Sequence, residues 1–394
     1  MGRGCALCGG KAESRALAHM PPMPPTGRLL SAGDPPLPLR PLRFQYCPEC
    51  GFIQLAPQAE AAPDYRNVSR ATKRQLPSYV DDLLKRSHAY CRREAPRVMD
   101  IGCNDGAFLD RAAEHGYAFR LGVEPSRLLA EVCLGAGHET ECTFFSHAVA
   151  VELARRHPPA DVLFVRHVLE HVPDPADFLR GLQVMLAPGG VALIEVPDAA
   201  NVVVDMLGHE LWDEHLGYYT ERTLRLMLAR CGFDVLELST EPHRGGRNLL
   251  CWVRAAEEMR QPEYAAGVER DLAACRCFGP AWAEFRARLR GRAAAWPKPV
   301  VAMGASHPQL NFAWYTGIEG SIHKMVDDDE EKVGKFLQLA EPVGIVSTSG
   351  LLAGDAPGTL LLTAFGCDSW TERVVRAMED KGVLVVDPYA LMRR

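Results

Sequence analysis

The sequence predicts an α/β protein with three parts: a small cysteine-rich module, a central doubly wound sheet, and a smaller C-terminal α/β domain. Three observations predict this. Two Cys-x-x-Cys pairs lie near the start of the chain, apolar runs alternate with helical patterns from residue 97 to about 255, and a second alternation begins at residue 300. The chain has 394 residues, which is too long for one ordinary domain. We expect the parts to span 1–62, 63–255 with a helical lead-in at 63–95, and 256–394 with a helical linker first.

The composition excludes several classes of protein. A net charge of −6 and an isoelectric point near 6.1 give no basic footprint for nucleic acid. No apolar run approaches the roughly 20 residues that span a bilayer, and the first residues lack the apolar segment of a signal peptide. The 13 cysteines are typical of reduced thiols. We expect a cytoplasmic protein, a monomer or weak oligomer, that acts on a small molecule without nucleic-acid or membrane partners.

Four cysteines of the first part have the spacing of metal ligands. Cys5 and Cys8 form one Cys-x-x-Cys turn, Cys47 and Cys50 form the other, and glycine follows each turn. Four thiolates on two such turns make a closed tetrahedral zinc site with a structural role. A redox pair is the alternative, and iron instead of zinc stays open. The proline-rich residues between the pairs predict an irregular loop that is fixed only at its ends.

The stretch from about residue 63 to 93 reads as a helix that links the cysteine-rich module to the sheet. Tyr65 is a candidate substrate contact on this lead-in. The basic residues Arg70, Lys73 and Arg74 are the other candidates, although a solvated helix face is the better interpretation of those three.

A glycine turn organises the central part. An apolar run ends at Asp100, and Gly102, Asn104 and Gly106 follow before a helical pattern starts. Glycines here allow a tight turn whose backbone N–H groups approach a ligand. About 20 residues on, the next apolar run ends at Glu124, where an acid meets a ribose in nucleotide-binding folds. A plain βα turn is the alternative. The run resembles motif I of the class I S-adenosylmethionine (SAM) methyltransferases, which implies that these five residues bind SAM.

Seven strands are expected in this part, with an antiparallel final hairpin, as in a class I methyltransferase sheet. The candidates are 97–102, 119–124, 140–145, 161–166, 191–196, 233–239 and 248–254, and residues 186–190 form the turn before the fifth. Phe144 and Phe145 follow the third strand. One of them is expected to flank the adenine, with Phe144 preferred, and the other to lie in the core.

The segment after the fourth strand reads His-x-x-Glu-His, from His167 to His171. This is also the inverted zincin pattern, so a metalloprotease is an alternative; its place in a SAM-type frame argues against it. We expect His167 to lie near the methionine end of the cofactor and His171 to have a structural role where the next helix starts.

The loop after the fifth strand carries the predicted catalytic groups. Ligands of open α/β sheets bind at this edge. His215 is the natural base for proton abstraction beside a carbonyl, and Glu214 is placed to orient or assist it. Trp212, Tyr218 and Tyr219 are candidate substrate contacts. The alternative is an exposed polar loop.

The last part has strand-like segments at 300–305, 322–326, 343–347, 359–363 and 383–386, which predict a Rossmann-like domain. Gly304 begins a strand-to-helix turn that is suited to a phosphate, and His307 lies just beyond it. Both are candidate substrate contacts. The acidic run 327–331 reads as a solvated turn.

Taken together, these motifs resemble the sugar C-methyltransferases of antibiotic biosynthesis, which act on nucleotide-linked ketosugars. The matching segments are the four cysteines with residues 50–55, the glycine turn 100–106, residues 195–197, 214–220 and 245–246, and parts of 304–311. The resemblance implies a zinc module, a SAM domain, and a C-terminal Rossmann-like domain. Two departures stand out. Trp212 and Asp213 replace a tyrosine and a histidine, and residues 305–309 lack a lysine, which leaves the nucleotide handle open.

Three functions follow from the sequence. The first is SAM-dependent C-methylation, in which His215 removes a proton next to a ketone. The second is O- or N-methylation of another natural-product intermediate on the same scaffold. The third is a non-catalytic protein that keeps the fold, in line with the two departures.

Overall fold

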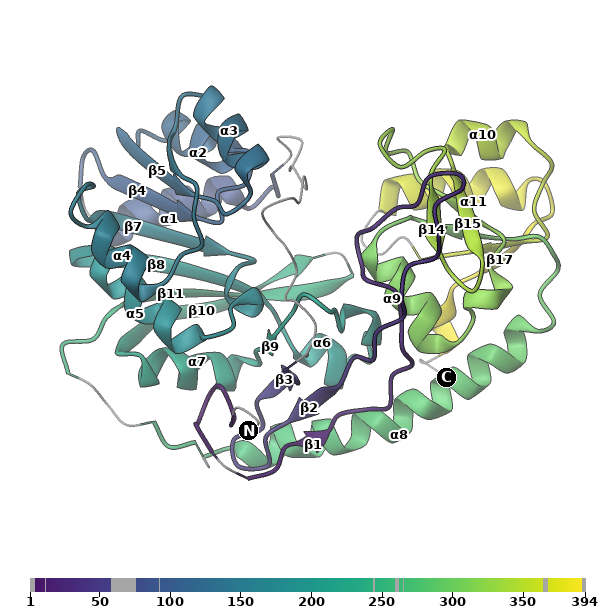
Figure 1. The fold of residues 1–394 in the computed structure, drawn as a ribbon, viewed down its shortest axis with the longest axis horizontal. Coiled ribbons are helices and arrows are strands. Elements are labelled where there is room, and N and C mark those ends of the chain that lie inside the picture. Colours follow the sequence, from purple (N-terminus) through teal and green to yellow (C-terminus); the bar gives the residue numbers. More distant parts are fainter. Residues whose placement is uncertain are drawn as a thin grey trace.

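The central sheet has seven strands, in the order β10-β11-β8-β7-β4-β5-β6, and β11 alone runs antiparallel to its neighbours. This is the strand order of class I SAM methyltransferases, so the predicted sheet and its final hairpin are confirmed. A computed structural model describes residues 4–10, 12–57, 76–91, 93–243, 245–258, 262–264, 266–363 and 368–391 (Figure 1). The strands are β4 (Arg97–Ile101), β5 (Phe119–Val123), β6 (Glu139–Glu141), β7 (Ala160–Arg166), β8 (Leu186–Pro197), β10 (Phe233–His243) and β11 (Gly246–Ala255).

Two strands differ from the prediction. β6 ends at Glu141, short of the predicted end at residue 145. β8 begins at Leu186, because Leu186 already pairs with Ala160 of β7, and the register shifts only after that pair. Residues 186–190 therefore belong to the strand instead of forming a separate turn.

Helices cover both faces of the sheet. α1 and α2 share a core with one face, and α4, α5 and α7 share a core with the other. The helices of this part are α1 (Val80–Cys91), α2 (Ala107–Glu114), α3 (Arg127–Gly135), α4 (His147–Leu153), α5 (Pro175–Met185), α6 (Ala200–Val203) and α7 (Glu221–Arg230), with the 3₁₀ turns η2 (Leu169–His171) and η3 (Gly208–Glu210). The structure describes the lead-in from residue 76, and residues 76–79 are loop and turn, so the helix begins at Val80 within the predicted range. Tyr65, Arg70, Lys73 and Arg74 lie outside the described residues.

The N-terminal module is an antiparallel sheet that takes its last strand from the central part. Its order is β1-β2-β3-β9, from β1 (Arg15–Ala16), β2 (Phe44–Tyr46), β3 (Ile53–Leu55) and β9 (Gly217–Tyr218). Ile53 pairs with Tyr218, directly beside the loop that carries the predicted base. The module and that loop therefore fold against each other.

The proline-rich segment between the cysteine pairs is held along its length, so the prediction of a loop fixed only at its ends was wrong. Leu30 and Phe336 exchange backbone hydrogen bonds of 2.9 and 2.8 Å, and the Gln338 amide nitrogen donates to the Leu37 carbonyl at 2.9 Å. Figure 1 shows this segment rising from β1 to the C-terminal domain and returning. Its prolines limit the backbone to extended forms, which suits a strap across a surface.

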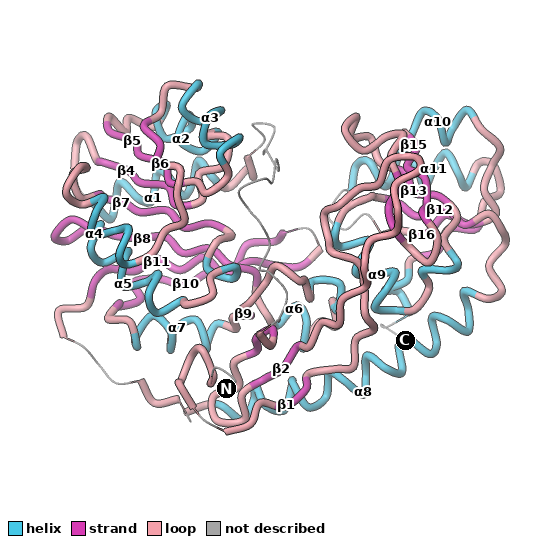
Figure 2. The backbone as a smooth tube through the Cα atoms, in the orientation of Figure 1, coloured by secondary structure: helices cyan, strands magenta, loops and turns pink. Residues whose placement is uncertain are grey.

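The C-terminal domain has a six-stranded sheet, in the order β14-β15-β13-β12-β16-β17, in which β14 is antiparallel to the rest. The sequence prediction missed β14. Figure 2 shows the long helix α8 along the bottom of the molecule, below β1 and β2 and below the C-terminal domain. The elements are α8 (Val268–Ala293), β12 (Val300–Met303), α9 (His307–Thr316), η4 (Glu319–Ser321), β13 (Lys324–Val326), β14 (Phe336–Gln338), β15 (Pro342–Val346), α10 (Thr348–Ala353), β16 (Thr359–Leu361), α11 (Asp368–Glu379), β17 (Leu384–Val386) and η5 (Pro388–Leu391).

One hydrophobic core joins the N-terminal module, α8 and the C-terminal domain. It contains Phe44 of β2, Trp282 of α8 and Phe312 of α9, all 1% exposed or less. Burying large aromatic rings of this kind stabilises an interface strongly. No helix in the described part of the chain has the length and apolar character needed to cross a bilayer.

Candidate active site

The glycine turn lies between β4 and α2 and has the backbone that its sequence predicts. Gly102 and Gly106 have φ angles of 80° and 79°, and Asn104 has a φ of 53°. A Cβ on Gly102 would lie 2.5 Å from Val168 Cγ2. Glycine is therefore required at position 102 by both its dihedral angle and its close neighbour.

Glu124 closes this turn from the end of β5. Its carboxylate accepts hydrogen bonds from the Asn104 N–H at 3.0 Å and the Ser126 N–H at 2.8 Å. Burial raises the pKa of Glu124, and these two backbone donors oppose the rise. The predicted ribose acid thus lies at the turn, where it fixes the loops after β4 and β5.

Asp100 is fully buried at the end of β4, and burial raises the pKa of its carboxyl to about 7 despite the positive charge of Arg166. The Arg166 guanidinium carbon lies 4.6 Å above the ring of Phe108. Arg166 Nη1 is buried without a hydrogen-bond partner among the described residues. This donor is the orphaned group that an anionic end of a cofactor would satisfy.

A buried polar network lies next to this edge, at the end of β8. Glu195 accepts hydrogen bonds from Tyr79 Oη at 2.5 Å and Asn248 Nδ2 at 2.8 Å, and lies 3.3 Å from His167 Nε2. Burial opposes charge on His167, but the carboxylate of Glu195 outweighs it and raises the pKa of His167 to about 9. His167 therefore carries a positive charge near neutral pH.

The loop from η3 to β9, residues 208–218, holds the predicted base. The rings of His215 and His171 lie 4.8 Å apart between centroids, and His171 Nδ1 lies 2.9 Å from the Glu214 carbonyl oxygen. One ligand atom from each of Glu170, His171 and His215 lies within 4.8 Å of the other two. His171 thus lies beside the predicted base and attaches the loop to η2.

Trp212 joins this loop to the other two parts of the chain. Its ring stacks on His307 at the start of α9, with centroids 4.0 Å apart and planes 9° apart. Its indole N–H donates to Thr26 of the N-terminal strap, and the Thr26 N–H donates to Asp213 at 3.3 Å. The base loop is therefore held where all three parts meet.

Two predicted substrate contacts have other roles in this structure. Tyr219 is 1% exposed, and its ring packs 5.2 Å from that of Phe52. Tyr218 is buried, and its hydroxyl accepts from the Trp212 N–H at 2.8 Å. Burial raises the pKa of Tyr218 well above its ordinary value. Both side chains therefore pack inside the protein and hold this loop in place, which corrects the prediction that they contact the substrate.

The histidines of the His-x-x-Glu-His run separate. His167 pairs with Glu195, whereas His171 turns towards Glu214 and His215, and η2 between them is a single 3₁₀ turn. The inverted zincin pattern requires its ligands on one helix. The two histidines are therefore not arranged as the zinc ligands of a protease would be.

The two phenylalanines after β6 separate, and Phe145 is the one that packs against the core. Phe144 is 46% exposed at this edge, and Phe145 packs against Phe178 of α5 at 5.3 Å.

The turn at Gly304 in the C-terminal domain has a φ of 84°. Asp327, at the end of β13, accepts from the Ala305 N–H at 2.9 Å and from Lys332 Nζ at 3.0 Å. Asp328 accepts from Thr348 at 2.7 and 2.8 Å. Asp327 and Asp328 thus hold the loop after β13, and the run stays a solvated turn as expected, because Asp328, Glu330 and Glu331 are exposed.

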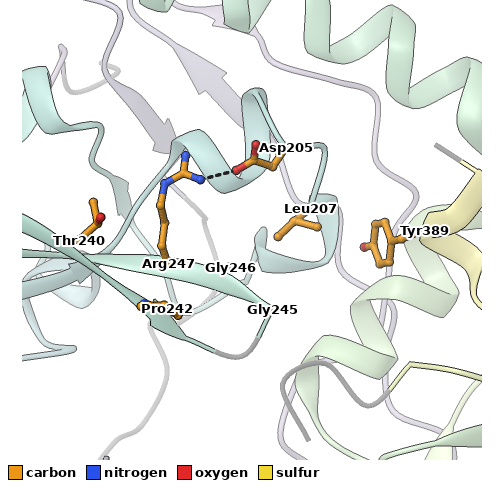
Figure 3. A pocket seen from close by; sticks show the side chains of 8 residues that line it. All are labelled: Asp205, Leu207, Thr240, Pro242, Gly245, Gly246, Arg247 and Tyr389. Atoms are coloured by element: carbon orange, nitrogen blue, oxygen red, sulfur yellow. Dashed lines mark hydrogen bonds and ion pairs between the residues drawn. The ribbon is translucent and has the colours of Figure 1, made fainter. Parts of the chain in front are cut away.

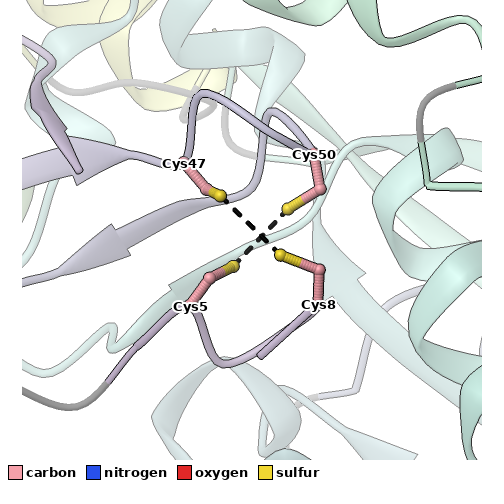
Figure 4. A group of neighbouring side chains, drawn as sticks. All are labelled: Cys5, Cys8, Cys47 and Cys50. Carbon is pink, nitrogen blue, oxygen red and sulfur yellow. Dashed lines mark hydrogen bonds between the residues drawn. The ribbon is translucent and has the colours of Figure 1, made fainter. Parts of the chain in front are cut away.

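The four cysteines converge on one point from two loops (Figure 4). Cys5 and Cys50 sulfurs are 3.5 Å apart, and Cys8 and Cys47 sulfurs are 3.7 Å apart. A tetrahedral zinc ion with Zn–S bonds of about 2.3 Å holds its sulfurs about 3.8 Å apart. The spacing therefore fits a closed four-thiolate metal site. Arg222 and Arg230 of α7 donate to backbone carbonyls of these loops, which attaches the module to the central part.

A cavity of about 460 Å³ lies between the β10–β11 hairpin and the C-terminal end of the chain (Figure 3). Arg247 enters it, paired with Asp205 at 2.6 Å and Asp198 at 2.7 Å. The other lining residues are Leu207, Thr240, Pro242, Gly245, Gly246 and Tyr389. This mixture of charged, hydroxyl and apolar groups suits a polar organic ligand.

The strand order, the glycine turn after β4 and the acid after β5 are those of a SAM-dependent methyltransferase domain. The comparison with known families agrees, since residues 72–238 match the family described as a methyltransferase domain.

The chain is similar to C-methyltransferase NovU of Streptomyces niveus, with 30% identity over 161 residues, 41% of this chain and 38% of that protein. It is also 33% identical over 102 residues to the ubiquinone biosynthesis O-methyltransferase of Aeromonas salmonicida, which is 25% of this chain and 42% of that protein. The chain thus spans less than half the length of either relative. The magnesium protoporphyrin IX methyltransferase of Synechocystis, solved with bound SAM, aligns with 44% of this chain and 76% of its own, at 14% identity and a TM-score of 0.34.

Proposed function

We propose that the protein is a SAM-dependent C-methyltransferase that methylates carbon next to a ketone, with a nucleotide-linked ketosugar as the acceptor. The observation that carries the proposal is the position of His215. It lies in a loop at the carboxyl edge of a methyltransferase sheet, beside His171, and that loop contacts the second α/β domain through the Trp212–His307 stack. A base between a methyl-donor domain and a separate α/β domain suits a large acceptor.

The described residues fit SAM. The glycine turn would present its backbone N–H groups, Glu124 would meet the ribose, and Phe144 would lie against the adenine. The orphaned Arg166 Nη1 and the charged His167 would lie at the methionine end. Bound SAM supplies an electrophilic methyl group on a sulfonium, and holding it in line with the carbon nucleophile provides much of the rate.

The chain's own residues would prepare the acceptor. A ring nitrogen of His215 takes the proton from the carbon next to the ketone, and Glu214 and His171 hold the loop through their mutual hydrogen bond. The protonated His215 stabilises the negative charge that develops on the ketone oxygen. Gly304 and His307, at the start of α9, would meet the distal part of the acceptor.

We also propose that zinc occupies the four-cysteine site and has a structural role, because four thiolates leave no open position for chemistry.

The test is a transfer assay with methyl-labelled SAM and a panel of nucleotide-linked 4-ketosugars, read by product mass. His215→Ala should abolish transfer and leave SAM affinity within about twofold, because His215 lies outside the glycine turn. His19→Ala changes an exposed histidine of the N-terminal strap and is the control. Lost SAM binding together with unfolding in His215→Ala would remove the mechanistic claim.

O-methylation is the second candidate, favoured by the O-methyltransferase among the relatives. The two differ in carbon-acid chemistry. In D₂O, without SAM, a C-methyltransferase should exchange deuterium into the position next to the ketone, and His215→Ala should not. Transfer to a hydroxyl without such exchange would favour the O-methyltransferase.

A further inference from the structure

We propose that Glu170, His171 and His215 form a second metal site, for a divalent transition metal such as Zn²⁺, and that metal bound there blocks the base. The inhibition of the base by metal rests on the proposed function, whereas the metal site itself does not.

The geometry carries the site. One ligand atom from each of the three side chains lies within 4.8 Å of the other two. Two come from η2, and His215 comes from the base loop. With metal–ligand distances of about 2.0–2.2 Å, tetrahedral ligand atoms lie about 3.4 Å apart, so small side-chain rotations complete the set. Two histidines with a glutamate is also the ligand set of catalytic zinc sites, which keep one position open.

The Glu170 carboxylate is the second, independent observation. Its residue is 1% exposed, and neither carboxylate oxygen accepts a hydrogen bond from any described residue. The nearest ion-pair partner is His167 Nδ1, at 3.4 Å from Oε1. The charged His167 lies beside the carboxylate, but both oxygens keep acceptor positions that no hydrogen bond uses, and a metal ion would fill them.

The hydrogen bond of His171 gives the orientation that a metal ligand needs. When Nδ1–H donates to the Glu214 carbonyl at 2.9 Å, the lone pair of the ring lies on Nε2. Metal-binding histidines typically donate their other N–H to a carbonyl or carboxylate in this way. The loop carbonyl therefore fixes a tautomer that is suited to metal binding.

Metal and proton then compete for the same nitrogen of His215. Binding displaces the proton from any imidazole that carries one, and no oxidant or reductant is involved. While the metal is bound, His215 has no free lone pair for proton abstraction. The site thus makes methyl transfer sensitive to free Zn²⁺ through residues that are separate from the four cysteines.

The binding test uses the full-length protein with its structural metal in place. Isothermal titration with Zn²⁺, without acceptor, should show one additional equivalent. Co²⁺ at this site should give visible absorption without the near-ultraviolet band of a cobalt thiolate. Glu170→Gln and His171→Gln should each weaken this binding at least about tenfold, and His19→Gln should leave it unchanged. Absence of a second equivalent, or one insensitive to both substitutions, would overturn the site.

The activity test separates the two proposals. Adding Zn²⁺ to one equivalent above the structural metal should lower methyl transfer at least about tenfold, and EDTA sufficient to remove that equivalent should restore it. Unchanged or increased transfer with the second equivalent bound would overturn the blocked base. If no acceptor is methylated under any condition, the proposed function fails, while the titration still decides the metal site.

Discussion

The charge on His167 offers a quantitative test of the buried network at the end of the central sheet. Its ring lies between Glu195 and Glu170, at 3.3 and 3.4 Å. Burial opposes the charge on His167, but these two carboxylates outweigh it and raise the pKa of His167 to about 9, from its ordinary value of 6.5. This difference corresponds to about 3 kcal/mol. Because the side chain is 34% exposed, solvent screening reduces the expected value to about 1–2 kcal/mol.

The sign follows from linkage. The folded pKa is the higher one, so the folded state binds the proton more tightly, and the stabilisation is fully present below pH 6.5. It is lost as the pH rises through about 9. We expect His167→Asn, which tolerates the φ of 54° at this position, to lower the free energy of unfolding more at pH 6 than at pH 9.5.

The measurement is the free energy of unfolding in urea for wild type and His167→Asn at both pH values, with His19→Asn as an exposed control. The difference between wild type and variant should be larger at pH 6 by about 1–2 kcal/mol. NMR titration of the His167 ring gives its folded pKa directly. An equal difference at both pH values, or a ring that titrates near 6.5, would refute the reasoning.

Three further predictions concern the cofactor turn, the domain contact and the metal. Gly102→Ala should weaken SAM binding in titration calorimetry at least about tenfold, because its Cβ meets Val168 at 2.5 Å. Gly116→Ala, with a φ of 86° and open space around it, is the control for backbone strain. If both substitutions weakened SAM binding equally, the steric explanation for Gly102 would be contradicted. Trp212→Leu removes the stack on His307, which should cost about 0.5–1.5 kcal/mol of acceptor binding, or up to about tenfold in kcat/KM. Unchanged kinetics would contradict a role of this contact between the two domains in binding the acceptor. Cys47→Ser should remove zinc by elemental analysis and lower the unfolding temperature, whereas the exposed thiol variant Cys142→Ser should retain both.

The central sheet was predictable because its strands are short apolar runs and its helices are amphipathic, so each element is encoded locally. The glycine turn and Glu124 follow for the same reason, since both lie at fixed distances along one βαβ unit. The strand β14 was not predicted, because it has only three residues. It pairs with β15, and the bridge from Phe336 to Leu30 of the N-terminal strap has no local signal in the sequence.

The base cluster was only half predictable. His215 was predicted as the base from its loop, but Glu170 and His171 lie more than 40 residues earlier, and only the fold brings them to it. The same applies to Tyr218 and Tyr219. Their adjacency suggested a substrate surface, whereas Tyr218 pairs with β3, Tyr219 bridges to Asp198, and both rings are buried.

The pairing of β3 with β9 has a consequence for synthesis on the ribosome. The N-terminal module leaves the exit tunnel with its cysteines and three strands, while the fourth strand, Gly217–Tyr218, is still unmade. At about 5–20 residues per second, the nascent module waits on the order of 10 s with the edge of β3 unpaired. Free strand edges invite pairing between chains. The module expressed alone should therefore self-associate even when its metal is bound, since the strand that covers its edge belongs to the active-site loop.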